Sequence, residues 1–427
     1  MVKEHRKVLV IAGVFPPERI AEADHAFRVS LELAKRDFRI EVLTQQGAVA
    51  GPELPFRVHP IMSRWSWYEL ARLLKVARRF APDVVHLWFL GNIYHFHPMI
   101  TFVPALLKRL LPKTAVVTQV SFPVPSGAYR FPLSTRLARK AFAVGFGPAG
   151  IDYGYGALLR DSDSVIVMAP GHLDTLATHC PGLARKTILI PPPPLLQMAP
   201  ATAESRARGR KALGLAEDDF VFAYFGRLYR LKGLETLLEA FHLLRRRHPR
   251  VKLAVIGGAD PGWSDSDWKV EQLYEMARTL DIEDAIAWSG EFPFDSDLGS
   301  AYLRAADCAV LPFDRGVALN NSSFAGVAAH ALATLATRGD TLDSPFRDGE
   351  NVLLCPPLNP PAMADAMERL LVDPQLRARL HSGIEALARE WFSWEGSIDR
   401  TIAAFDIGSA PSQRDTVQRA AVRAEGL

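Results

Sequence analysis

Short runs of apolar residues alternate along this chain with longer segments in which every third or fourth residue is apolar. The clearest example starts at the run Phe220–Phe225, which ends at Gly226 and is typical of a buried strand. Apolar residues then recur at helical spacing from Leu234 to Leu244, so one face of a helix is apolar. The next apolar run, Leu253–Ile256, stops at a pair of glycines. This order predicts a strand, helix, strand unit.

The same alternation occupies both halves of the chain. It predicts strands at Lys7–Gly13 and Ile40–Thr44 in the first half, and at Ile286–Ser289 and Cys308–Pro312 in the second, with helices between them. Such an order is typical of parallel sheets covered by helices on both faces. Four prolines at Pro191–Pro194 interrupt it, and proline fits neither a helix interior nor a central strand. We therefore expect two domains joined by a linker, with a cleft at the carboxyl ends of their strands, where ligands bind.

Length and composition agree with this division. The 427 residues exceed one compact domain, and 48% hydrophobic with 23% charged residues is an ordinary globular balance. The net charge of +3 is too small to favour a nucleic-acid partner, and no binding motif for nucleic acid is present. Cys180, Cys308 and Cys355 lie far apart, which predicts reduced thiols in a cytoplasmic protein rather than a metal site.

One apolar stretch requires a separate interpretation. Val84 to Leu107 contains no Asp, Glu, Lys or Arg and is long enough to span a bilayer. Glycine, asparagine, histidines and prolines interrupt it, so a strand, loop and helix of a soluble core is the better interpretation. The apolar segment at the N-terminus is too short for a signal peptide and lacks a small-residue cleavage site. We expect neither a leader nor a membrane span.

The turn between Gly226 and Gly233 carries the first candidate chemistry. It holds three cations, Arg227, Arg230 and Lys232, beside the N-terminus of the predicted helix. Backbone N–H groups and cationic side chains in such a position can hold a phosphate. The other interpretation is that the glycines shape the turn while the cations are solvated. Spacing alone does not decide between the two.

The segments FGRL, KGLETLLEAF and KLAVIGG of this region resemble the second domain of the family 4 (group 1) retaining glycosyltransferases of the GT-B fold. The resemblance implies an α/β protein with two Rossmann-like, doubly wound parallel-sheet domains facing a cleft. It implies that Arg227 and Lys232 hold the diphosphate of a nucleotide-diphosphate sugar. The segment WFSW at 391–394 resembles the element after which the last helix of this family returns to the first domain. The implied organisation is an acceptor domain at 1–194, a donor domain at 195–390, the returning helix at 391–408 and a disordered polar tail at 409–427.

Several positions depart from the pattern of this family. In the first domain, Ile20 and Ala21 replace the usual Gly-Gly loop, and Val120 replaces a histidine that reaches the donor sugar. In the second domain, Ala318 and Gly326 align with the two usual glutamates. The candidate residues for the cleft side of the first domain are Pro17, Asp24, His25 and Val120.

Polar residues at the start of a second predicted helix, after Pro312, are further candidates. The run 320–323, Asn-Asn-Ser-Ser, could hold a phosphate or a sugar at this helix N-terminus. Alternatively, Ser322 or Ser323 simply caps the helix. With the turn at 290–292, the candidate donor-binding residues are Gly226, Gly233, Gly290, Glu291, Phe292, Asn320, Asn321, Ser322 and Ser323, and the candidate catalytic residues are Arg227 and Lys232.

Three Asp-Ser-Asp triplets, at 161–163, 265–267 and 295–297, raise the question of a metal. Transferases of the other major fold use Asp-x-Asp to hold Mn²⁺ or Mg²⁺ on the diphosphate. Here the triplets precede strands or lie in loops, and the implied architecture meets phosphate charge with Arg and Lys. We interpret all three as surface turns, and we expect no metal and no cofactor beyond the nucleotide-sugar co-substrate.

The predicted helix Trp65–Arg79 carries aromatic residues at one end and cations at the other. Such a helix can lie on an anionic membrane, and many family relatives act on lipid-linked acceptors. The preferred interpretation is that the aromatics fill the core while the cations are solvated. The expected location is cytoplasmic, with peripheral contact at the inner membrane face as the other option.

The predicted function is metal-independent transfer of a sugar, with retention, to a glycan, lipid-linked or small-molecule acceptor, as in polysaccharide biosynthesis. Fixed cations would stabilise the charge that develops on the departing diphosphate. The rival is a catalytically degenerate GT-B protein that binds a nucleotide or a partner without transfer, because several usual site residues are absent. A dinucleotide-dependent oxidoreductase does not fit, since no GxGxxG follows the first strand of either domain.

Overall fold

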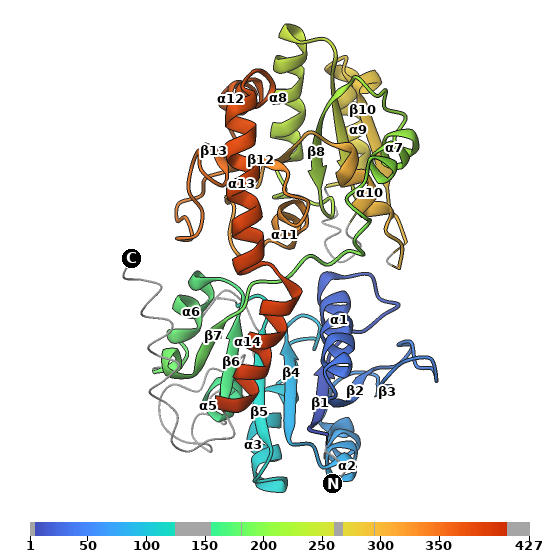
Figure 1. Cartoon of the computed structure of the whole chain (residues 1–427). Coiled ribbons are helices and arrows are strands. Elements are labelled where there is room, and N and C mark those ends of the chain that lie inside the picture. The colour runs from blue at the N-terminus through green and yellow to red at the C-terminus, as the bar shows by residue number, and fades with distance from the viewer. Residues whose placement is uncertain (1–4, 124–154, 181, 260–267, 294, 408–427) are drawn as a thin grey trace. The chain divides into compact units, whose positions relative to one another are not determined.

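The computed structural model describes residues 5–123, 155–180, 182–259, 268–293 and 295–407 (Figure 1). Its internal contacts divide the chain into two compact units. The first unit comprises Met1–Ile190 and Ile398–Leu427, and the second comprises Pro191–Ser397. The division falls at the start of the run of prolines, where the sequence predicts a linker.

The first unit contains a parallel sheet in the order β3-β2-β1-β4-β5-β6-β7. Its central strands β1, β4 and β5 are almost entirely buried, as expected of parallel strands with helices on both faces. The strands are β1 (Lys7–Ala12), β2 (Arg39–Gln45), β3 (Arg57–Met62), β4 (Val84–Phe89), β5 (Ala115–Val120), β6 (Ser164–Val167) and β7 (Thr187–Leu189). The helices are α1 (Ala21–Lys35), α2 (Leu70–Phe80), α3 (Met99–Leu110), α5 (Gly156–Asp161) and α6 (Pro170–Ala177), with short 3₁₀ turns η1 (Trp67–Glu69) and η2 (Leu183–Lys186).

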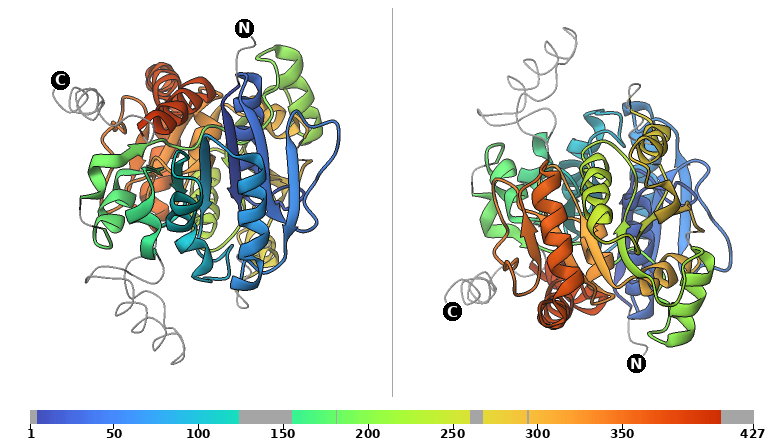
Figure 2. Two further views of the ribbon diagram at one scale, coloured as in Figure 1. Left: turned by 90° about the horizontal axis from the view of Figure 1, so that it is seen from below. Right: turned by 90° about the horizontal axis from the view of Figure 1, so that it is seen from above.

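The second unit contains a parallel sheet in the order β10-β9-β8-β11-β12-β13. Its helices α8 and α12 pack side by side (Figure 2, right). The strands are β8 (Phe220–Phe225), β9 (Val251–Ile256), β10 (Ile286–Gly290), β11 (Cys308–Leu311), β12 (Ala333–Thr337) and β13 (Leu353–Cys355). The helices are α7 (Ala203–Ala212), α8 (Leu234–Arg247), α9 (Val270–Thr279), α10 (Leu298–Ala305), α11 (Ser322–Ala328), α12 (Pro360–Val372) and α13 (Pro374–Trp391), with the 3₁₀ turn η4 (Glu283–Ala285).

The strand, helix, strand unit predicted from the periodicity is confirmed. β8 and β9 pair in parallel, and α8 connects them. The apolar face of α8, from Leu234 to Leu244, is buried in the core with the two strands. The apolar stretch Val84–Leu107 is also correctly predicted, because β4 and most of α3 occupy it. Among the described helices, we find none with the length and hydrophobicity needed to cross a membrane.

The last described helix, α14 (Trp394–Ile407), passes from the second unit into the first. Its Phe405 is fully buried and lies edge-on to the rings of Phe38 and His86, with centroids 6.3 and 5.4 Å away. Asp406 of the same helix pairs with Arg6, directly before β1. The helix α14 therefore contributes to the core of the first unit.

Two predictions about local structure need correction. Trp65 does not start a helix: it is buried with a left-handed φ of 49° and packs on Tyr94, and α2 begins only at Leu70. Asp163, read as part of a surface turn, joins α3 to β5, because its carboxylate accepts from Lys108 Nζ at 2.7 Å and from Val116 N at 2.9 Å. Asp163 directly precedes β6, so these bonds fix the residue at which that strand begins. Asp163 therefore has a structural role and is not part of a solvated turn.

The third Asp-Ser-Asp triplet forms an ion pair with α7. Asp297 pairs with Arg208 of α7 at 2.6 Å, whereas the triplet at 265–267 lies outside the described residues. Within the described parts of the chain, no group of three or more His, Cys, Asp or Glu side chains is placed to hold a metal ion.

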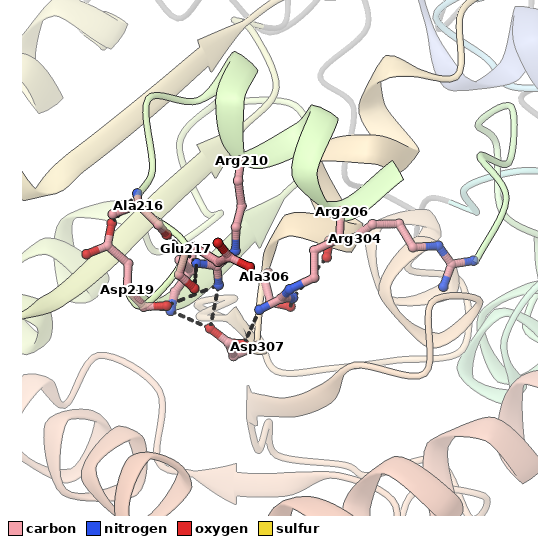
Figure 3. A network of polar contacts seen from close by, with 9 residues as sticks. Arg206, Arg210, Ala216, Glu217, Asp219, Arg304, Ala306 and Asp307 are labelled. Carbon is pink, nitrogen blue, oxygen red and sulfur yellow. Dashed lines mark hydrogen bonds and ion pairs between the residues drawn. The ribbon is translucent and has the colours of Figure 1, made fainter. Parts of the chain in front are cut away.

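A buried charge network fixes α7 to the starts of β8 and β11 (Figure 3). Arg210 is 4% exposed and donates to the carbonyls of Ala216, Glu217 and Asp219, at distances of 2.5–3.0 Å. It also pairs with Asp307 at 3.2 Å. Asp307 in turn accepts from Val221 N at 2.8 Å and from Arg206 at 2.6 Å. The network therefore joins α7 and the neighbouring start of β8 to the start of β11, where Asp307 lies 97 positions after Arg210.

Two buried histidines of the first unit predict a loss of stability in acid. Burial lowers the pKa of His25 and that of His86 from 6.5 to about 3. Between these pH values the unfolded chain binds protons at the two imidazoles while the folded chain does not. The free energy of unfolding therefore falls as the pH falls. At pH 5 each histidine should lower it by about 2 kcal/mol relative to neutral pH.

Urea unfolding at pH 7.5 and pH 5.0 measures this loss. The variant His86→Gln should lose about 2 kcal/mol less than the parent on acidification, since one titrating group is gone. The control His381→Gln replaces an exposed histidine of α13 and should lose as much as the parent. If His86→Gln shows the full acid loss of the parent, burial of His86 is not its source.

Candidate functional site

The candidate site of the second unit is built on glycines at the carboxyl ends of β8 and β9. Gly226 has a φ of +142°, and a Cβ there would lie 2.3 Å from the Oγ of Ser323 on α11. Gly257, with a φ of +136°, has the carbonyl oxygen of Gly226 only 2.1 Å from the place of a Cβ. Side chains at either position would clash and adopt strained backbone geometry. The glycines therefore let two strand ends and the start of α11 meet.

Arg227 directly follows Gly226 in the sequence. Its Nη1 lies 2.9 Å from the Oε1 of Glu291, in an ion pair whose side chains are 31% and 44% exposed. Gly258 makes room for this pair, because a Cβ on Gly258 would lie 2.1 Å from the Cγ of Glu291. Gly290, with a left-handed φ of +63°, turns the chain after β10 just before Glu291. The structure thus brings the predicted site residues Gly226, Arg227, Gly290 and Glu291 together with Gly258.

Lys232 lies at the other end of the same turn. Its ammonium is 4.9 Å from the ring centroid of Tyr229 and 4.7 Å from that of Phe313, both within cation–π range. Gly233 follows as the N-cap residue of α8, with a φ of +72°. A Cβ on Gly233 would lie 1.9 Å from the carbonyl oxygen of Pro312. The turn with its cations is therefore packed against the loop after β11.

Asp314 in that loop is a site residue that the sequence did not reveal. Its Oδ1 lies 3.1 Å from the place of a Cβ on Gly233. This oxygen atom is buried and has no hydrogen-bond partner among the described residues. Burial raises the pKa of this carboxyl group, and the charge of Glu235 raises it further. Asp314 thus places a second carboxyl group beside the start of α8. No local pattern marks it, since it follows two apolar residues in an irregular loop.

The run 320–323 starts α11, but no side chain in it caps that helix. Asn321 is the N-cap residue, and its Oδ1 accepts from the N–H of Ala318 at 2.7 Å instead. The interpretation that Ser322 or Ser323 caps the helix is wrong, because both are the first helical residues. Ser323 is buried and faces Gly226, whereas Asn320 and Ser322 are half-buried.

A hydrogen-bonded chain that the sequence did not predict holds the far end of α11. The Nδ1–H of His330 donates to the carbonyl of Gly326 at 2.7 Å, so Nε2 accepts from the hydroxyl of Ser300 at 2.6 Å. The oxygen of Ser300 in turn accepts from the N–H of Ala199 at 2.9 Å. Ser300 and His330 are both buried. The segment after the proline run is thereby anchored to α10 and to the helix that carries Ser323.

The two positions that the resemblance aligns with glutamates hold the small residues Gly326 and Ala318. At Gly326, a Cβ would lie 2.5 Å from the ring of Phe225, so this ring fills the space that a longer side chain would need. Ala318 lies in the loop before α11 and is half-buried. Phe292, predicted as a donor contact, packs on α10, where its ring lies 6.2 Å from that of Tyr302 and against Gly299.

Two of the four candidates in the first unit are core residues. Val120 is fully buried in the apolar core, and His25 is 5% exposed, with its ring 4.8 Å from that of Trp88. Val120 packs in the core at the end of β5, and His25 packs on Trp88 from α1. Pro17 is exposed and Asp24 is half-buried on α1, near Arg28. Neither of these two residues is buried.

Residues 205–385 match the family model described as glycosyl transferases group 1, and they make up most of the second unit. The second unit is therefore similar to the group 1 glycosyl transferases. Curated relatives include a D-inositol 3-phosphate glycosyltransferase of Acidothermus cellulolyticus, 31% identical over 54% of this chain and 50% of its own length. A protein of the same description from Geodermatophilus obscurus is 28% identical over 60% of this chain and 56% of its own. The chain thus spans about half the length of the curated relatives it matches.

Solved structures are similar to the whole chain in fold. A sucrose-phosphate synthase from Thermosynechococcus elongatus aligns with a TM-score of 0.66 at 18% identity, covering 94% of this chain and 98% of its own. The Anabaena protein HepE, in complex with UDP and glucose, aligns with a TM-score of 0.66 at 17% identity, covering 93% and 98%. The prediction of two Rossmann-like, parallel-sheet domains of the GT-B class is therefore confirmed.

Proposed function

We propose that this protein is a retaining, family 4 glycosyltransferase that takes a sugar from a nucleotide-diphosphate sugar. The observation that carries the proposal is the turn between β8 and α8. It presents Arg227 at one end and Lys232 at the other, above backbones kept free of side chains by Gly226, Gly257 and Gly258. Backbone amides, a helix start and two cations form a suitable environment for a diphosphate.

The chemistry follows from where charge develops. Breaking the anomeric bond leaves negative charge on the diphosphate, and cations fixed in advance stabilise that charge as it forms. Arg227 and Lys232 are proposed for this role, with Gly226, Gly233 and Ser323 shaping the phosphate pocket. In this proposal Arg and Lys supply the positive charge, so neither a metal nor another cofactor takes part.

A UDP-sugar is the first donor to test, because the structural neighbour HepE is described in complex with UDP-glucose as well as with UDP. The acceptor in the proposal is a glycan, a lipid-linked molecule or a small polyol. The polyol option is supported by the relatives named D-inositol 3-phosphate glycosyltransferase. Asp24 and the exposed Pro17 are the first-unit residues proposed to face the acceptor.

The proposed location is the cytoplasm, with contact at the inner face of the membrane through the first unit. Trp65 fills the core, as the preferred interpretation held, whereas Tyr68 is 95% and Trp67 40% exposed on η1. The helix α2 that follows exposes four cations, Arg72, Lys75, Arg78 and Arg79. Exposed aromatics followed by cations fit an anionic bilayer surface.

Nucleotide release from UDP-, GDP-, ADP- and dTDP-glucose by the purified full chain tests the proposed function. A transferase should hydrolyse one of these donors slowly without acceptor, and should hydrolyse it with EDTA present. The anomeric configuration of the product, read by NMR, then tests retention. Donor binding with no hydrolysis, and no transfer to any offered polyol or glycan, would contradict the proposal in favour of a degenerate binding protein.

A further inference from the structure

The guanidinium proposed to hold a donor phosphate already holds a carboxylate. Glu291 Oε1 lies 2.9 Å from Arg227 Nη1, although the two residues are separated by 64 positions in sequence. Carboxylate and phosphate oxygens accept the same N–H bonds from arginine. An anion that binds to this part of Arg227 must therefore share it with Glu291 or displace it.

The local backbone is shaped to put Glu291 there. Gly290 turns the chain in the left-handed region, and Gly258 leaves the space that the Cγ of Glu291 takes, 2.1 Å from the place of a Cβ. Ser289, the residue before this turn, accepts from the N–H of Gly257 at 3.0 Å and so ties the loop to the end of β9. The side chain of Glu291 thus lies beside Gly258, and its carboxylate pairs with Arg227.

We propose that Glu291 sets donor affinity by occupying, in the empty protein, the place on Arg227 that a donor phosphate oxygen takes. This inference rests on the proposed function. The side chain of Glu291 is 44% exposed, so it can rotate into solvent when the diphosphate arrives. Two anions competing for one guanidinium repel each other, and half-exposed ion pairs are weak enough to be exchanged. Glu291 therefore keeps Arg227 in position while the site is empty and opposes the binding of weak anions.

Isothermal titration with inorganic pyrophosphate and with UDP tests this role. Glu291→Gln keeps the shape of the side chain and removes its charge, so both ligands should bind about two- to fivefold more tightly than to the parent. Glu350→Gln is the matched control, because Glu350 pairs with Arg347 at 3.6 Å and both side chains are about two-thirds exposed. It should leave both affinities unchanged. Unchanged or weaker binding to Glu291→Gln would overturn the inference.

A double variant separates failure of this inference from failure of the proposed function. If Glu291 acts through Arg227, Glu291→Gln should have no effect in an Arg227→Ala background. Tight binding by Arg227→Ala would refute the phosphate site and the inference together, as would no binding by either the parent or Glu291→Gln. Loss of binding in Arg227→Ala, with no gain in Glu291→Gln, would refute only the role of Glu291.

Discussion

Replacing Arg227 by alanine is expected to lower the rate of sugar transfer by about a hundredfold to a thousandfold. Loss of one fixed donor that faces developing charge typically costs about 3–4 kcal/mol of transition-state stabilisation. Folding should be almost unaffected, because the ion pair with Glu291 is partly exposed and such pairs contribute little to stability. The effect should therefore appear in kcat with the protein still folded.

Two further arginine variants, one at position 227 and one at position 250, complete the kinetic experiment. Arg227→Lys keeps the charge but loses the planar fork, so its rate should lie between those of the parent and Arg227→Ala. Arg250→Ala removes an exposed arginine after α8 and should transfer sugar at the parental rate. Rates are compared at saturating donor, and circular dichroism checks the fold of each variant. A parental kcat for Arg227→Ala would remove Arg227 from the chemistry.

The part of this site that the sequence predicted is the part determined by local pattern. The apolar run of β8, the apolar face of α8 and the glycines between them are contiguous, so their periodicity could be read directly. Gly226 and Gly233 do adopt positive φ values, as turn glycines next to strands and helices often do. The same local rule placed the linker, because proline restricts its own backbone wherever it stands.

The unpredicted part depends on residues that meet only in the folded chain. Asp314 reaches the start of α8 from a loop on another strand, and Glu291 reaches Arg227 from across the sheet. Val120, which the resemblance aligns with a family histidine, ends a strand in which every residue is buried. Its apolar neighbours in the sequence imply this burial.

Replacing Arg210 by alanine is expected to destabilise the second unit by about 3–5 kcal/mol. Removing the buried partner of an ion pair, together with its hydrogen bonds to carbonyl groups, costs more than losing an exposed pair. Here Asp307 would keep only Arg206 and the N–H of Val221, and three carbonyls between α7 and β8 would lose their donor. The affected groups lie where β8 and β11 begin, so the strand that leads to Arg227 loses its anchor.

Arg208→Ala is the matched control, because Arg208 lies on the same helix and forms one exposed pair with Asp297. Urea unfolding should separate the two variants clearly, with a large decrease for Arg210→Ala and little change for Arg208→Ala. Hydrogen exchange locates the effect: the amide of Val221, which donates to Asp307, should exchange much faster in Arg210→Ala, while the strands of the first unit keep their protection. If both variants unfold at the same urea concentration, the network does not stabilise the second unit. Arg210 would then be a buried charge that the fold tolerates, and it would not stabilise the starts of β8 and β11.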